Sequence, residues 1–288
     1  SNLLFQFATF VTICKILSIF IAIYRILTCK FAKNKIILKH KKNYSFKLIN
    51  NSKIALALIL GSGVELDNEI TADRKILFED NRGVHHKVIY SCVTGGKKIL
   101  VFKGRRHFYE GYSHEEITSN INYAVKLGAE NILITNAAGG LNENFSEGDL
   151  MLITSHINFI DKLRFSAVKN NPAFYSKGLQ DKFRNSCKST NVMLQEGTYG
   201  CYTGPTFETN SEIRFQKRIM LDAAGMSTVP EVIDAVSKNI NVAAVSIITN
   251  LLKENSSGQT SHDNVLITAK KASESLKKIL PVFISQLN

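Results

Sequence analysis

Short runs of consecutive apolar residues recur through residues 51–288 and constrain the fold more than any other feature. They occupy residues 54–60, 99–102, 132–135, 150–153 and 242–248. A strand that is apolar on both faces is typical of a sheet that is covered on both sides. Because helical patterns alternate with these runs, the sequence predicts a single α/β domain with a mixed, mostly parallel central β-sheet flanked by helices.

Three segments between and after the runs show helical spacing. Residues 116–127 repeat apolar side chains at intervals of three and four, which predicts an amphipathic helix. Residues 230–237 predict a second helix with Thr228 as its N-cap. The chain from residue 264 onward predicts a third, and we expect Pro281 to kink it.

The charge of the chain is concentrated at its start. The 288 residues include 36 Lys and Arg and 24 Asp and Glu, a formal net charge of +12. Nine of these bases and none of the acids lie in residues 1–50, so residues 51–288 hold 27 bases and 24 acids. We therefore separate a basic hydrophobic N-terminal segment, residues 1–50, from a nearly neutral domain, residues 51–288. The domain has no basic stripe with interleaved aromatic residues, so no nucleic-acid partner is expected.

The N-terminal segment allows three interpretations. Residues 3–29 are apolar apart from Lys15 and Arg25, and a membrane span needs about 20 residues. The segment is a membrane anchor that leaves the domain on the cytoplasmic side, a signal peptide without a small-residue cleavage site, or an extension foreign to the domain. We expect a cytoplasmic domain whose membrane contact, if any, runs through residues 3–29.

The cysteines favour a reducing compartment. Five are present and none forms a CxxC pair: Cys14, Cys29, Cys92, Cys187 and Cys201. An odd number without that spacing argues against a disulfide framework and against a zinc site.

Three of the expected strands end in residues that suit an anion. Residues 61–63 (GSG) offer backbone N–H groups and a hydroxyl, residues 104–107 (GRRH) add a guanidinium and an imidazole, and residues 136–140 (NAAGG) form a small-residue turn. Ligands of open α/β sheets gather at the carboxyl ends of strands. Together the three ends predict one phosphate site.

Six segments carry a resemblance to a known family. They are residues 104–112 (GRRHFYEGY), 135–142 (TNAAGGLN), 204–209 (GPTFET), 225–232 (GMSTVPEV), 246–250 (SIITN) and 261–265 (SHDNV). In this order they resemble the motifs of the trimeric class of purine nucleoside phosphorylases. The resemblance implies the nucleoside phosphorylase fold, a homotrimer, and a role in purine salvage. It also implies phosphorolysis of a purine (deoxy)nucleoside to the base and (deoxy)ribose 1-phosphate, with inorganic phosphate as co-substrate and no metal or organic cofactor.

The same resemblance assigns expected roles to individual residues. For phosphate it implies Ser62, Arg105, His107, the Ala137 amide and Ser227. For the ribose it implies Tyr109, Met226, His262 and His85, with the adjacent His86 as the alternative to His85. For the purine it implies Phe207, Glu208 and Asn250. Of these residues, we expect Asn250, Glu208 and His107 to be catalytic, whereas His114 and His156 carry no such signal and are read as structural.

Several departures from the family pattern keep other functions open. Glu65 and Asp67 add acids beside the expected phosphate, residues 70–85 are short, and residues 159–185 lack a usual Asn-Pro-Leu run. The preferred function is phosphorolysis of 6-oxopurine nucleosides such as inosine and guanosine. The alternatives are a 5′-methylthioadenosine phosphorylase and a degenerate, non-catalytic nucleoside-binding protein.

Overall fold

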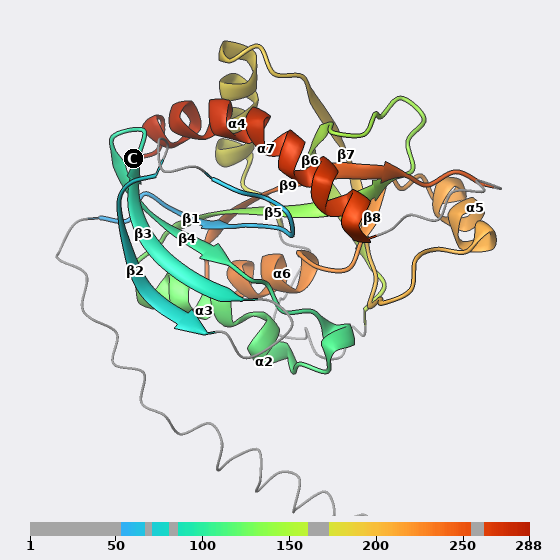
Figure 1. Ribbon diagram of the computed structural model, residues 1–288, viewed down its shortest axis with the longest axis horizontal. Coiled ribbons are helices and arrows are strands. Elements are labelled where there is room, and N and C mark those ends of the chain that lie inside the picture. Colours follow the sequence, from blue (N-terminus) through green and yellow to red (C-terminus); the bar gives the residue numbers. More distant parts are fainter. Residues whose placement is uncertain (1–52, 67–70, 81–85, 161–172, 255–261) are drawn as a thin grey trace, which may run out of the picture. The chain divides into compact units, whose positions relative to one another are not determined.

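The computed structural model describes residues 53–66, 71–80, 86–160, 173–254 and 262–288, with side chains of the last range from residue 265 (Figure 1). By contacts the chain divides at Lys47 and Leu48, and only the second unit falls within the described residues. The membrane-anchor hypothesis for residues 3–29 and the fate of Cys14 and Cys29 therefore lie outside them. No helix among the described residues is both long and apolar enough to cross a membrane.

Strands and helices alternate along the described chain. The strands are β1 (Leu56–Ile59), β2 (Ala72–Asp80), β3 (Lys87–Thr94), β4 (Lys97–Lys103), β5 (Asn131–Gly140), β6 (Leu150–Asn158), β7 (Leu194–Cys201), β8 (Ala223–Gly225) and β9 (Asn241–Leu251). The helices are α2 (His114–Ile117), α3 (Ser119–Lys126), α4 (Lys177–Ser189), α5 (Asn210–Arg218), α6 (Val229–Ser237) and α7 (His262–Ser285), with a 3₁₀ turn η1 (Phe108–Glu110).

One mixed sheet joins the strands, as predicted. Its order is β2-β3-β4-β1-β5-β8-β7-β6-β9, and β9 also pairs with β5, so five of its strands close into a ring. The pairings β1–β4, β1–β5 and β5–β9 are parallel. The carboxyl ends of these four strands therefore meet at one edge, which brings the three anion-friendly segments together.

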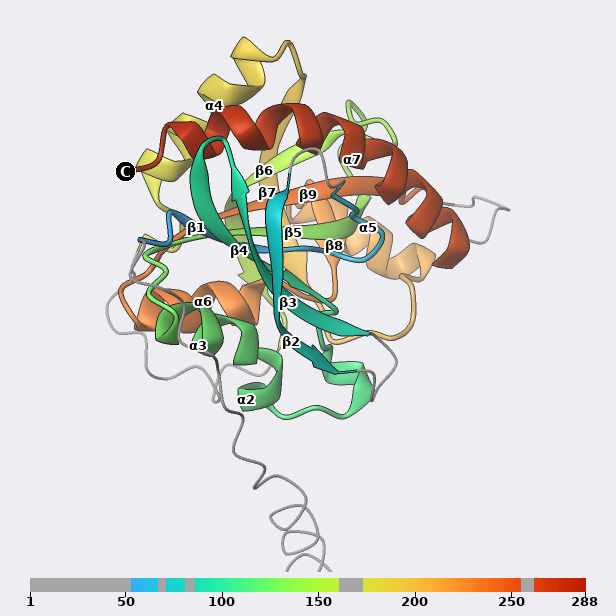
Figure 2. The ribbon, with the colours of Figure 1, turned by 60° about the vertical axis from the view of Figure 1, so that its left-hand side comes forward.

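Helices cover both faces of the sheet, which explains the continuous apolar runs. Along β1, Ala57 and Ile59 pack into a core cluster with α3 and α6, while Leu56 and Leu58 pack into another with α4 and α7. Successive strand residues point to opposite faces, so both sets must be apolar. Figures 1 and 2 show α4 and α7 on one side of the sheet and α3 and α6 on the other.

The helix boundaries correct two predictions. The expected helix over residues 116–127 is instead two helices that meet at Thr118, whose hydroxyl donates to the His114 carbonyl at 3.1 Å. Ser113 caps the first through a capping box with Glu116. The prediction that Thr228 caps α6 is right in position, but its side chain makes no capping bond. Pro281 lies inside α7, which continues to Ser285, so the proline does not end the helix. The kink expected at Pro281 stays a prediction.

Candidate functional site

A cavity of about 260 Å³ lies at the edge where the parallel strands end. Ten of the residues singled out from the sequence line it: Ser62, Arg105, His107, Tyr109, Ala137, Phe207, Glu208, Met226, Ser227 and Asn250. His85 lies outside the described residues, and His262 begins α7 with a side chain that is likewise outside them. The structure thus gathers segments that are as far apart in sequence as Ser62 and Asn250 around one space.

The GSG segment is tied directly to the end of β5. The Gly61 N–H donates to the Thr135 hydroxyl oxygen at 2.9 Å, and the Thr135 hydroxyl faces the Ile59 carbonyl at 3.4 Å. A Cβ on Gly61 would come within 2.7 Å of the Asn136 Cα, so only glycine allows this approach. These contacts hold Ser62 and Ala137 at the same end of the cavity.

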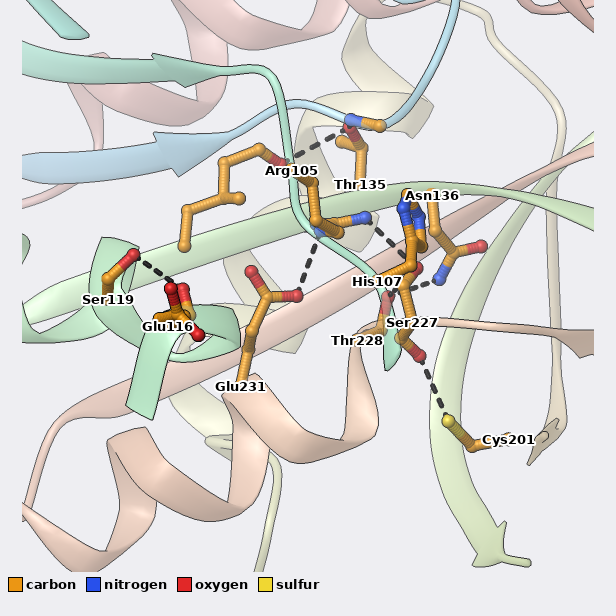
Figure 3. A network of polar contacts seen from close by, with 12 residues as sticks. Arg105, His107, Glu116, Ser119, Thr135, Asn136, Cys201, Ser227, Thr228 and Glu231 are labelled. Carbon is orange, nitrogen blue, oxygen red and sulfur yellow. Dashed lines mark hydrogen bonds and ion pairs between the residues drawn. The ribbon is translucent and has the colours of Figure 1, made fainter. Parts of the chain in front are cut away.

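Arg105 is a buried guanidinium aimed at that end. Its Nε lies 2.9 Å from Glu231 Oε2, and its Nη1 donates to Ser227 Oγ at 3.2 Å (Figure 3). Its Nη2 is buried and has no hydrogen-bond partner among the described residues. A guanidinium with a spare, desolvated donor is suited to a phosphate oxygen.

His107 is held beside Arg105 by a short local motif. Glu110 Oε1 lies 2.9 Å from both the His107 backbone nitrogen and its Nδ1. The imidazole also stacks on the Tyr109 ring, with centroids 5.0 Å apart. The ring orientation is therefore set by residues of the same turn, η1, before any ligand binds.

The start of α6 completes the anion end. Thr228 has a φ of 79°, and its hydroxyl accepts from the Asn136 side-chain amide at 2.8 Å instead of capping the helix. The Ser227 carbonyl accepts from the Tyr199 hydroxyl at 3.3 Å and from the Cys201 thiol at 3.2 Å. These bonds turn the Ser227 side chain toward Arg105, so a strained turn is held by several partners.

The middle of the cavity has an apolar wall. Met226 and Tyr109 face Gly204, where an added Cβ would lie 2.4 Å from the Met226 Sδ and 3.0 Å from the Tyr109 ring. Gly204 also has a φ of 75°, which favours glycine. The loop after β7 is thereby packed onto the two residues that were expected to contact a ribose.

An amide and a carboxyl, those of Asn250 and Glu208, also line the cavity. The Thr249 hydroxyl faces Asn250 Oδ1 at 3.1 Å and the Ala138 carbonyl at 3.3 Å. Where Oδ1 accepts from Thr249, the amide NH₂ is directed away from it and can donate to a ligand. Burial raises the pKa of the Glu208 carboxyl, and the charge of Glu212 adds to the rise. Phe207 beside it is 46% exposed.

Glu65 and His156 lie outside the cavity and make structural contacts. Glu65 lies 3.4 Å from the Lys270 ammonium on α7 and does not line the cavity. His156 Nδ1 lies 2.9 Å from the Tyr175 hydroxyl, and burial lowers the pKa of His156 to about 4. Among the described residues, no three His, Cys, Asp or Glu side chains form a group that could hold a metal ion.

Sequence reasoning missed two acids and a hydroxyl of the site. Glu110 lies three residues after His107 in the same turn, Glu231 lies within the segment 225–232, and Thr249 precedes Asn250. The only indication of these residues in the sequence is that each lies within a segment that resembles the family motifs. The structure adds the contacts by which each one orients a cavity residue.

The chain matches known proteins over most of its length. The sequence profile described as the phosphorylase superfamily matches residues 55–285. Purine nucleoside phosphorylase 1 of Bacillus subtilis is 35% identical over 248 residues, which are 80% of this chain and 92% of that protein. Purine nucleoside phosphorylase of Bos taurus is 35% identical over 214 residues, which are 68% of this chain and 73% of that protein.

Solved structures agree with this. Schistosoma mansoni purine nucleoside phosphorylase in complex with adenosine has a TM-score of 0.75 and 26% identity, covering 83% of this chain and 93% of that one. Isoform 2 of the Schistosoma mansoni enzyme, in complex with cytosine and ribose-1-phosphate, has a TM-score of 0.73 and 31% identity. That match covers 83% of this chain and 93% of the other.

Proposed function

The chain belongs to the phosphorylase superfamily, as an enzyme of the purine nucleoside phosphorylase kind, and from this premise we propose that it cleaves 6-oxopurine nucleosides such as inosine and guanosine with inorganic phosphate. The observation that carries the proposal is the mixed lining of one cavity. Arg105, Ser227 and Ser62 line it together with Glu208 and Asn250. Phosphate and purine are the two ends of this reaction.

At the anion end, Arg105 binds phosphate through its spare Nη2, with hydroxyls of Ser62 and Ser227, the ring of His107 and the Ala137 amide as further donors. A phosphate oxygen then attacks the anomeric carbon from the face opposite the base, and the C–N bond breaks. The base gains the proton that the phosphate loses. Positive charge develops on the sugar in the transition state, where Tyr109 and Met226 exclude water.

At the base end, the bonding pair moves into the purine. The Asn250 amide donates to N7, where negative charge grows as the C–N bond breaks, and the Glu208 carboxylate accepts from N1–H. An interaction that is stronger in the transition state than in the ground state accelerates the reaction. The Thr249 hydroxyl supports this role because its contact with the amide oxygen orients the Asn250 side chain. Phe207 covers the purine face.

The amide at position 250 favours a 6-oxopurine over a 6-aminopurine. A carboxylate at this position could accept from an exocyclic amine, whereas an amide NH₂ donates to N7 and O6. 5′-Methylthioadenosine is the competing substrate. One Schistosoma mansoni neighbour was solved with adenosine and also with inosine, so the wider fold accommodates both base classes in that protein.

The test is a phosphate-dependent assay with inosine, guanosine, adenosine and 5′-methylthioadenosine, with the products separated by chromatography. We expect turnover of the first two, no turnover without phosphate, and unchanged rates after treatment with EDTA. Turnover of methylthioadenosine alone would overturn the substrate assignment. Inosine binding without any phosphate-dependent product would establish the degenerate, non-catalytic alternative. We also propose a homotrimer, which light scattering of the purified chain measures.

A further inference from the structure

Glu231 is a completely buried carboxylate in the first turn of α6 that the proposed reaction does not use. An acid in the first turn of a helix is favoured by the helix dipole, but a surface position would serve that purpose. A buried, unpaired carboxylate is costly, so its partners indicate why it lies there. They are Arg105, which lies just after β4, and Lys87, the first residue of β3.

The contact with Arg105 determines which guanidinium atoms face the cavity. Glu231 Oε2 lies 2.9 Å from Nε, with both side chains almost fully buried. Ser227 Oγ accepts from Nη1, so the two partners occupy one nitrogen each and leave Nη2 (Figure 3). Without the carboxylate, only the contact with Ser227 would hold the rotation of the guanidinium about its stem.

Glu231 also acts on the turn that presents Ser227. Burial raises the pKa of its carboxyl, and the charge of Arg105, the N–H of Thr228 and the charge of Lys87 oppose that rise. The Thr228 N–H belongs to the residue with φ of 79°. The carboxylate therefore joins two elements of the site: it belongs to the first turn of α6, which follows the Ser227–Thr228 turn, and it contacts Arg105 in the segment after β4.

Lys87 is the second cation of the group. It is 5% exposed, its Nζ donates to Ser119 Oγ at 2.9 Å and lies 5.3 Å from the centre of the Tyr123 ring. Burial and the charge of Arg106 lower the pKa of Lys87 to about 8, against the opposing effect of Glu231 and Asp80. A lysine this deeply buried is rare unless it is paired.

The charges of the group do not cancel. Arg105, Lys87 and Arg106 are three cations against the two carboxylates of Glu231 and Asp80, and all of these except Arg106 are buried. Low polarity around them strengthens their field. Without Lys87, two cations would face two carboxylates, and the attraction of the group for an anion would be weakened. Lys87 therefore gives the group its net positive charge.

We propose that Glu231 and Lys87 are positioning residues of the phosphate site, Glu231 by orienting Arg105 and the Ser227–Thr228 turn, and Lys87 by offsetting the carboxylate's charge. Neither residue lines the cavity, so both act through Arg105 and Ser227. The proposal rests on the proposed function, since it assigns the same cavity end to phosphate.

The test compares Glu231→Gln and Lys87→Met with the wild type and with Glu196→Gln. The control removes a carboxylate that pairs with Arg184 at 2.7 Å and does not line the cavity. Steady-state kinetics give the KM for phosphate at saturating inosine and the KM for inosine at saturating phosphate. Calorimetric titration with inorganic phosphate alone measures binding without turnover.

We expect Glu231→Gln to raise the phosphate KM and Kd at least about tenfold, the size of losing a hydrogen bond between charged groups. Lys87→Met should raise both at least about threefold through the lost charge. The KM for inosine should stay within about twofold in each variant, and Glu196→Gln should match the wild type. A merely structural role would lower thermal stability without separating the two KM values.

Unchanged phosphate constants in folded Glu231→Gln, or equal changes in both KM values, would overturn the proposal. If Glu231→Gln does not fold, Lys87→Met decides, and an unchanged phosphate Kd there also overturns it. If the wild type binds phosphate but does not turn over inosine, the proposed function is refuted. The phosphate Kd values of the variants, measured by calorimetric titration, then still test the positioning roles of Glu231 and Lys87. The two failures are thus distinguishable.

Discussion

Gly61→Ala adds a single methyl group where the sheet and the candidate phosphate site meet. The new Cβ would lie 2.7 Å from the Asn136 Cα and 3.0 Å from the Thr135 carbonyl oxygen, both backbone atoms of β5. Ordinary carbon contacts begin near about 3.5 Å. Since β5 is paired on both sides, the GSG segment must move by roughly 1 Å to relieve the overlap.

Two costs follow from that displacement. Overpacking of a tight site costs about 1–3 kcal/mol, and the weakened bond from the Gly61 N–H to Thr135 adds about 0.5–1.5 kcal/mol. For a domain of this size each kcal/mol lowers the Tm by roughly 2–4 °C, so a fall of about 3–18 °C is expected. Because Ser62 follows Gly61, the phosphate KM should also rise, by about tenfold or more for one lost charge-assisted hydrogen bond.

Differential scanning calorimetry measures the fall in Tm, and phosphate-dependent kinetics measure the rise in the phosphate KM. The matched control is Gly178→Ala near the start of α4, where the nearest atom to a new Cβ is 4.0 Å away. Gly-to-Ala at such a helical position stabilises by about 0.4–1 kcal/mol, so the control should melt slightly higher with unchanged kinetics. A Gly61→Ala protein with wild-type Tm and phosphate KM would refute the reasoning from close backbone approach.

Three further predictions concern the base end and the core. Asn250→Ala should lower kcat for inosine by at least about 10²-fold, the scale of losing one transition-state donor; near-normal turnover would exclude its role. Because burial raises the pKa of the Glu208 carboxyl, kcat/KM should begin to fall, as the pH is lowered, at a higher pH than for an ordinary glutamate, and Glu208→Gln should abolish that fall; a profile that is the same in wild type and variant would exclude the role of Glu208. Phe183→Ala removes a fully buried ring that packs edge-on against Phe283, with the ring centroids 5.5 Å apart. The free energy of unfolding, measured with denaturant, should fall by about 3–5 kcal/mol, and neither KM should change. A smaller loss would mean that the core between α4 and α7 refills the space.

The sheet was predictable because its strands depend on local sequence, and the cavity lining was predictable because six segments resemble the motifs of a known family. Each run that is apolar on both faces became a strand, and parallel pairing of β1, β4, β5 and β9 brought their ends together. The segment after each strand then determined the lining residue, as with Arg105 after β4 and Asn250 near the end of β9. Placement at the cavity supports the expected roles, which the kinetic variants test.

The parts that the sequence did not reveal depend on contacts between distant residues. Four strands, β2, β3, β7 and β8, were not predicted. In β2 the side chains are largely exposed and include charges that interrupt any apolar pattern. The closure of β5 through β9 into a ring depends on which strands meet, which no local pattern encodes. Glu231 reads as an ordinary helix first-turn acid until Arg105, 126 positions earlier, is found against it.

The two ends of the cavity are built differently, and this has a consequence for specificity. The anion end rests on buried contacts between strand ends and α6, such as Arg105 to Glu231 and Asn136 to Thr228. At the base end, Glu208 lies between β7 and α5, and Phe207 beside it is half exposed. A change of base preference therefore needs little rearrangement of the core, whereas a change at the phosphate end disturbs the sheet. Substitutions near Glu208 should accordingly alter which purine is cleaved at little cost in stability, while those around Glu231 should alter phosphate binding and stability together.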